Sequence, residues 1–145
     1  EYLSGDDPGS DQDEEFDPLW GRWPQFSELY VYTYAPETRI GEVTNLHRVG
    51  FGVTTFPIKQ LELCADYHLL MANENTRGGA TVAGVNAFAQ DGDIRGHLFT
   101  ALLRYKISEH LFGHLIGEVL LPGDYYHDDY NDTATFVRGE LTLKW

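Results

Sequence analysis

The end of the chain, residues 133–145, alternates between apolar and polar side chains. One side holds Val137, Gly139, Leu141, Leu143 and Trp145, and the other holds Phe136, Arg138, Glu140, Thr142 and Lys144. Successive side chains of a β-strand point to opposite faces, so this pattern predicts an amphipathic strand. A membrane-spanning β-strand has one face toward lipid and one toward water, and a terminal tryptophan suits the interfacial aromatic belt. An amphipathic strand of a soluble β-sandwich explains this segment alone equally well.

Four earlier stretches show the same alternation and are predicted as strands. They cover residues 44–56, 61–72, 94–107 and 111–121. Tight turns are predicted at 57–60 and 108–110, and long loops at 73–93 (with a short strand at 81–88) and 122–132. Alternating short turns and long loops are typical of up-and-down membrane barrels. Runs of 11 to 14 residues suffice for the roughly 9–11 residues of a spanning strand and exceed the roughly 5–6 of most soluble strands.

The first 43 residues depart from this pattern. Residues 1–4 are predicted to end a strand already under way, so we expect a mature fragment or further strands before Glu1. Residues 5–43 are predicted as a long outer loop, because glycine and proline recur in its first part. Its aromatic stretch 26–34 is predicted as a plug segment, because counting strands back from a periplasmic C-terminus leaves no place there for a full crossing.

The sequence therefore predicts an all-β fold, an antiparallel up-and-down transmembrane β-barrel. Residues 1–145 are interpreted as the C-terminal segment of a larger barrel, with five membrane-spanning strands in residues 44–145. About eight strands form the smallest closed barrel, so remaining strands or partner chains are expected to complete the wall. The expected location is the bacterial outer membrane, with its lipid as a partner. A soluble β-sandwich is the alternative.

The alternation assigns the strand residues to two faces. The predicted pore-lining residues are Arg48, Glu62, Asp66, His68, Arg104, Lys106, His114, Glu118, Arg138, Glu140 and Lys144. The predicted lipid-facing or interfacial residues are Phe51, Leu63, Tyr67, Leu103, Tyr105, Leu115, Leu141, Leu143 and Trp145. Arg48, Arg104, Lys106 and Arg138 are candidates for guiding an anion. The alternative is that these bases pair with acids on neighbouring strands.

The net charge of -13 argues against nucleic acid as a partner. The acids gather in two loop regions. They are Asp6, Asp7, Asp11, Asp13, Glu14, Glu15 and Asp17 in the first, and Asp124, Asp128, Asp129 and Asp132 in the second. Several carboxylates together suggest calcium, although the stretch at Asp11 and Asp13 lacks the glycine and terminal glutamate of a calcium loop. Solvated acidic loops without a cofactor are the simpler interpretation.

Catalytic motifs are not found in the sequence. No nucleophile elbow, phosphate-binding glycine loop or HExxH helix is present, so an enzyme is not expected. Cys64 is the only cysteine, which excludes an internal disulfide framework. It falls among the pore-facing positions of its strand, where it is interpreted as a small residue that fills space.

Several stretches resemble the C-terminal part of the alginate-export family of bacterial outer-membrane barrels. They are YLSGDDP and FDPLWGRWPQFSELY near the start, TNLHRVGFG in the middle, and GHLIGEVLLPGDYY and FVRGELTLKW near the end. The resemblance implies a monomeric barrel with more strands than this chain supplies. It also implies a porin or exporter type of channel that passes anionic polysaccharide or small anionic solutes. A non-conducting outer-membrane scaffold or surface-binding barrel is the alternative function.

Overall fold

The computed structural model describes residues 1–5, 7, 9–14, 16, 26–29, 45–75, 81–82, 85–86, 89 and 91–145. Six strands form one antiparallel sheet in the order β1-β2-β3-β6-β7-β8. They are β1 (Tyr2–Leu3), β2 (Leu46–Ile58), β3 (Leu61–Met71), β6 (Ile94–Lys106), β7 (Leu111–Pro122) and β8 (Ala134–Leu143). A separate hairpin joins β4 (Thr81–Val82) to β5 (Val85–Asn86), and a 3-10 turn, η2, spans Asp128–Tyr130. The prediction of an all-β, antiparallel fold is confirmed.

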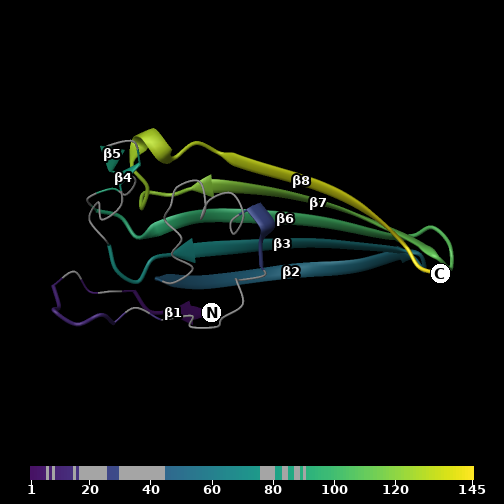
Figure 1. The fold of residues 1–145 in the computed structure, drawn as a ribbon, viewed down its shortest axis with the longest axis horizontal. Helices are drawn as coiled ribbons and strands as arrows, with labels where there is room; N and C mark the ends of the chain where they lie inside the picture. Colours follow the sequence, from purple (N-terminus) through teal and green to yellow (C-terminus); the bar gives the residue numbers. More distant parts are fainter. Residues whose placement is uncertain are drawn as a thin grey trace.

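The five long strands run side by side along the molecule (Figure 1). The two tight turns and the C-terminus lie at one end, here called the turn end. The longer connections, with β4, β5 and η2, lie at the other, here called the loop end. Among the described residues the sheet is open, because β1 and β8 are its edges and do not pair with each other. Closure into a barrel therefore belongs to the proposals below.

The turn between the first two long strands is shorter than predicted. β2 continues through Pro57 to Ile58, and only Lys59 and Gln60 turn. Proline lacks an N–H and is tolerated on an edge strand or at a bulge. Both conditions hold here, because β1 covers β2 only at its first two residues and the register with β3 shifts between Thr55 and Ile58. The predicted single strand at 81–88 was also wrong, because two short strands form a hairpin there.

Asn45 joins the loops to the sheet at the loop end. Its φ of 53° lies in the left-handed region, which asparagine tolerates better than most residues. Its side-chain Oδ1 accepts hydrogen bonds from the backbone N–H groups of Asn73 (2.8 Å) and Glu74 (2.9 Å). Its carbonyl accepts one from Nη1 of the buried Arg95 (3.0 Å), whose guanidinium lies over the Tyr125 ring. These contacts fix the start of β2 against the connection that follows β3.

The register separates the strand side chains as the alternation predicts. Directly opposed residues share a face, so the pairing of Val53 with Ala65 and of Ala65 with Ala101 defines an apolar face. The pairing of Glu62 with Arg104 belongs to the opposite, polar face. The apolar face is uncovered in this structure, with Val137 73% and Leu141 71% exposed.

The buried core lies on the other side of the sheet. It is a cluster of five fully buried leucines at the loop end. Its members are Leu29, Leu46, Leu70, Leu98 and Leu120. Four of them come from β2, β3, β6 and β7, and Leu29 covers them from a segment outside the sheet. The polar face therefore carries an apolar core at one end, which the alternation did not predict.

Candidate functional site

The polar face of the sheet is the candidate site. Among the five long strands, every Asp, Glu, Lys and Arg except Arg95 lies on this face by register. Arg95 stands where the pairing of β3 with β6 is irregular, and it turns to Asn45 instead. The apolar face carries no Asp, Glu, Lys or Arg in these strands, and its only ionisable imidazoles are those of His47 and His97. Charge is thus confined to one side of the sheet.

The arginines of this face are neutralised by carboxylates. Arg104 pairs with Glu62 directly across β3 and β6, with 2.8 Å between Nη1 and Oε1. Arg48 pairs with Glu1 at 2.9 Å and lies over the ring of Phe26. Of the predicted anion-guiding residues, Arg48 and Arg104 therefore each have a carboxylate partner.

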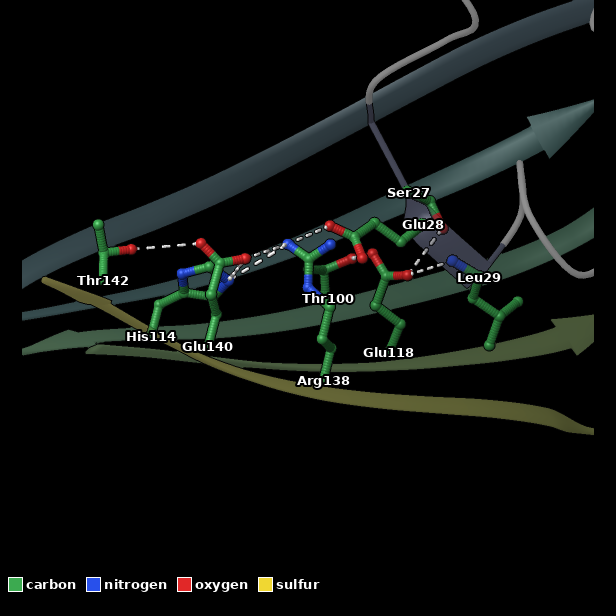
Figure 2. A network of polar contacts seen from close by, with 9 residues as sticks. All are labelled: Ser27, Glu28, Leu29, Thr100, His114, Glu118, Arg138, Glu140 and Thr142. Carbon is green, nitrogen blue, oxygen red and sulfur yellow. Dashed lines mark hydrogen bonds and ion pairs between the residues drawn. The ribbon is translucent and has the colours of Figure 1, made fainter. Parts of the chain in front are cut away.

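Residues 26–29 lie across the polar face and are held there by Glu118 (Figure 2). Glu118 is 2% exposed, and its Oε2 accepts hydrogen bonds from the Leu29 backbone N–H (2.6 Å) and the Ser27 hydroxyl (3.1 Å). The Thr100 hydroxyl donates to its Oε1 at 3.3 Å. A buried carboxylate needs such donors, since an unpaired buried charge is costly. The predicted pore-lining Glu118 therefore contacts residues 26–29, here called the covering segment.

An ion pair holds the same segment from the neighbouring strand. Glu28 Oε1 lies 2.8 Å from Nη2 of Arg138 on β8. That nitrogen is also 3.2 Å from His114 Nε2 and 3.9 Å from Glu140 Oε2. Figure 2 shows this chain of polar contacts running from the covering segment along β7 and β8 toward Thr142. The segment is thus bound by one buried carboxylate and one partly exposed salt bridge, with Leu29 in the apolar core.

Of the other predicted pore-lining residues, His68 lies opposite Leu98 of the leucine cluster, and Asp66 lies in the middle of β3. His68 lies beside Arg48, with 3.3 Å between Nδ1 and Nη1, and its ring meets Phe26 edge-on. Asp66 shares a cavity of about 310 Å³ with residues of the covering segment. Lys106 and Lys144 both approach the ring of Phe112 at the turn end. The alternation did not predict that Phe112 contacts both lysines, because an aromatic residue on the polar face gives no signal of its own.

The other candidate residues are placed as follows. Cys64 is half-buried on the polar face, where its thiol donates to Glu62 Oε1 (3.3 Å) and accepts from the Thr54 hydroxyl (3.4 Å). Within the described residues no three His, Cys, Asp or Glu side chains gather in a group able to hold a metal ion. Asp6, Glu15 and Asp17 of the first acidic region, and most of the predicted plug segment 26–34, lie outside the described residues.

The apolar face carries an aromatic row near the middle of β2, β3 and β6. The row consists of Phe51 on β2, Tyr67 on β3 and Phe99 on β6. The Tyr67 ring centroid lies 5.3 Å from that of Phe51 and 5.1 Å from that of Phe99. The Tyr67 hydroxyl is 2.8 Å from His97 Nδ1, so its polar atom has a partner. Of the predicted lipid-facing leucines beyond this row toward the turn end, four are exposed and Leu63 is half-buried; the exposed ones are Leu103, Leu115, Leu141 and Leu143.

Comparison with protein-family models, with curated proteins and with solved structures found no match to this chain. The described residues include no helix with the length and apolar character that crossing a membrane requires.

Proposed function

We propose that this chain forms part of the wall of a bacterial outer-membrane β-barrel, as a component of a porin or exporter type of channel. Its apolar face contacts lipid and its polar face lines the interior. The observation that carries the proposal is the confinement of charge to one face over five long strands. A soluble sheet of this size does not usually leave so many large apolar side chains uncovered on its other face.

The height of the apolar band supports the same proposal. From Thr135 to Trp145 is ten residues, a rise of about 26 Å at about 3.4 Å per residue and a tilt of about 40°. Membrane barrels present an apolar band of about 25 Å between two aromatic girdles. The stretch from Thr135 to Trp145 is therefore long enough to cross such a band.

The open edges of the sheet set what the rest of the wall must supply. β2 pairs with β1 only at Leu46 and His47, so most of its outer edge has no partner strand among the described residues. β8 has β7 on one side only. Edge strands of this length expose rows of unpaired N–H and C=O groups, which cannot face hydrocarbon. The proposal therefore requires further antiparallel strands at both edges.

Cysteine labelling in membranes tests the proposal. Cys64 and Ala65 are neighbours on opposite faces, with Cys64 on the polar face. The unmodified chain carries a cysteine at 64, and the variant Ala65→Cys in a Cys64→Ser background carries one at 65. In phospholipid vesicles a charged maleimide is expected to label Cys64. It is expected to label the cysteine at 65 at least about tenfold more slowly, because hydrocarbon excludes a charged reagent. In a soluble sheet the order reverses, since Ala65 is exposed and Cys64 is half-buried.

A non-conducting barrel is the second candidate function. It is favoured by the cluster of buried leucines, which includes Leu29 and lies on the polar face. A conducting passage needs water along that face, and the buried cluster excludes water from its loop end. Single-channel recording in lipid bilayers, on the complete barrel that contains this chain, distinguishes the two. Stable conductance steps are expected for the channel component. A barrel that passes the labelling test and never conducts would establish the non-conducting alternative.

A further inference from the structure

A cavity of about 310 Å³ lies on the polar face beside the covering segment. The side chains of Phe26, Leu102 and Ile116 give it an apolar wall. Its ionisable lining residues are Glu28, Asp66, Arg104, His114, Glu118 and Arg138. Small-molecule sites commonly combine apolar walls with a few placed polar groups, at volumes from about 300 Å³ upward. The balance of charge around this cavity therefore indicates which kind of molecule suits it.

The positive charges of the cavity are already balanced. Arg104 Nη1 lies 2.8 Å from Glu62 Oε1, and Arg138 Nη2 lies 2.8 Å from Glu28 Oε1. His114 Nε2 lies 3.2 Å from the same nitrogen of Arg138. Because a guanidinium only donates hydrogen bonds, the imidazole accepts in this contact and is uncharged. Neither arginine is therefore without a negative partner.

Two further carboxylates, those of Asp66 and Glu118, line the cavity without a basic partner among the described residues. They stand in one register row of the sheet, one on each side of Thr100. No lysine, arginine or histidine stands in this row. Glu118 is 2% exposed, yet its hydrogen bonds come from one amide and two hydroxyl groups, which carry no charge (Figure 2).

Asp66 is half-buried and forms no hydrogen bond or ion pair with the described residues. Its neighbour on β2 is Gly52, and the Asp66 carboxylate takes the space that a side chain there would fill. β2 therefore places no side-chain donor beside this carboxylate. His68, two positions farther along β3, lies against Arg48, with 3.3 Å between Nδ1 and Nη1. Asp66 and Glu118 thus give the cavity a surplus of two negative charges.

This surplus favours a positively charged occupant. Carboxylates taken out of water without a counter-charge cost free energy, and a cation placed beside them recovers part of it. Among the described residues no three His, Cys, Asp or Glu side chains form a group able to hold a metal ion. The cavity of about 310 Å³ also exceeds the roughly 30 Å³ that one water takes in the liquid. Its volume and its apolar wall favour a cation with a hydrocarbon body.

We propose that this cavity is a binding site for a small organic cation, a protonated amine. The ammonium group lies at the row of Asp66, Thr100 and Glu118, and the hydrocarbon body lies against Leu102 and Ile116. An ammonium group has three N–H donors, and the two carboxylates and the hydroxyl of this row supply acceptors for them. The inference goes beyond the proposed function, because binding here requires neither lipid nor conduction.

Calorimetric titration of the native protein that contains this chain, in detergent at low salt and neutral pH, tests the site. The probes are cyclohexylamine, cyclohexanol and cyclohexanecarboxylate, which share a six-carbon ring and differ in charge. We expect the protonated amine to bind, the alcohol to bind at least about tenfold more weakly, and the carboxylate to show no binding. Calcium chloride alone is the fourth probe, and we expect it not to displace the amine.

Matched variants assign the binding to this cavity. Asp66→Asn keeps the size of the side chain and removes its charge, and it is expected to lose tenfold or more in affinity for the amine, a difference of about 1.4 kcal/mol. Asp132→Asn removes the same charge from an exposed position in the connection between β7 and β8. It is expected to stay within about twofold of the unmodified protein. A thermal unfolding curve for each variant shows whether the fold is retained.

Five results overturn the site. They are no binding of the amine, equal binding of the alcohol, preferred binding of the carboxylate, displacement of the amine by calcium, and unchanged affinity in a folded Asp66→Asn variant. The membrane proposal is tested separately by cysteine labelling. Amine binding together with reversed labelling removes the membrane wall and keeps the site, and the opposite pair of results removes the site alone.

Discussion

Replacing Leu141 by arginine is expected to destabilise the membrane-inserted chain by about 2–4 kcal/mol. Leu141 lies on the apolar face of β8, about midway along the stretch from Thr135 to Trp145, and is 71% exposed in this structure. An arginine near the bilayer midplane costs about that much on the lipid face of a barrel. Urea unfolding of the chain in phospholipid vesicles measures the loss.

The neighbouring Thr142→Arg variant is the matched control. Thr142 lies on the polar face and is exposed, so the same charge there meets water and is expected to change stability by less than about 0.5 kcal/mol. In a soluble sheet both substitutions are surface changes of similarly small effect. Equal stabilities of the two variants in vesicles would falsify the assignment of the apolar face to lipid.

Replacing Glu118 by alanine is expected to free residues 26–29 from the polar face. The substitution removes the acceptor of the Leu29 N–H and of the Ser27 hydroxyl in a buried site. Hydrogen bonds to a charged group contribute about 1.5–3 kcal/mol each, and part of this returns as hydrogen bonds to water once the segment is released. A net loss of about 2–3 kcal/mol raises hydrogen exchange at the Leu29 amide roughly 30- to 150-fold.

Two further variants make the Glu118 prediction specific. Glu118→Gln keeps one acceptor oxygen, so we expect a smaller rise in exchange than in the alanine variant. Glu140→Ala removes a carboxylate from the same face that is half exposed and contacts the network only weakly, at 3.9 Å from Arg138. It is expected to leave Leu29 exchange nearly unchanged. Protection of Leu29 that survives in Glu118→Ala would show that the leucine cluster alone holds the segment.

The strands and their two faces could be predicted from the sequence to a useful degree. Alternation places Leu141 and Arg138 on opposite sides of β8 whatever the partner strand is, because the side-chain period of a strand is two. The strand ends were less predictable. Pro57 indicated a turn, yet β2 runs past it. Pro57 lies on a free edge and at a register shift, so the strand does not need the hydrogen bond that a proline nitrogen cannot donate.

The tertiary structure decided what covers the polar face. Four buried leucines lie on the polar side of their strands: Leu46, Leu70, Leu98 and Leu120. The two-residue period predicts that side for them, but it does not predict whether water reaches them. Only the register aligns them in one cluster, and only the approach of Leu29 buries them.

The alternation of apolar and polar residues by itself determined an all-β antiparallel sheet with charge on one face. It could not determine that Glu118 is buried, that Arg138 meets Glu28, or that the lysines gather around Phe112. Those contacts join residues up to 110 positions apart, Glu28 and Arg138 being the farthest of them. A local periodicity fixes the side of the strand to which a residue points, whereas its partner is fixed by the folding of distant segments onto that side.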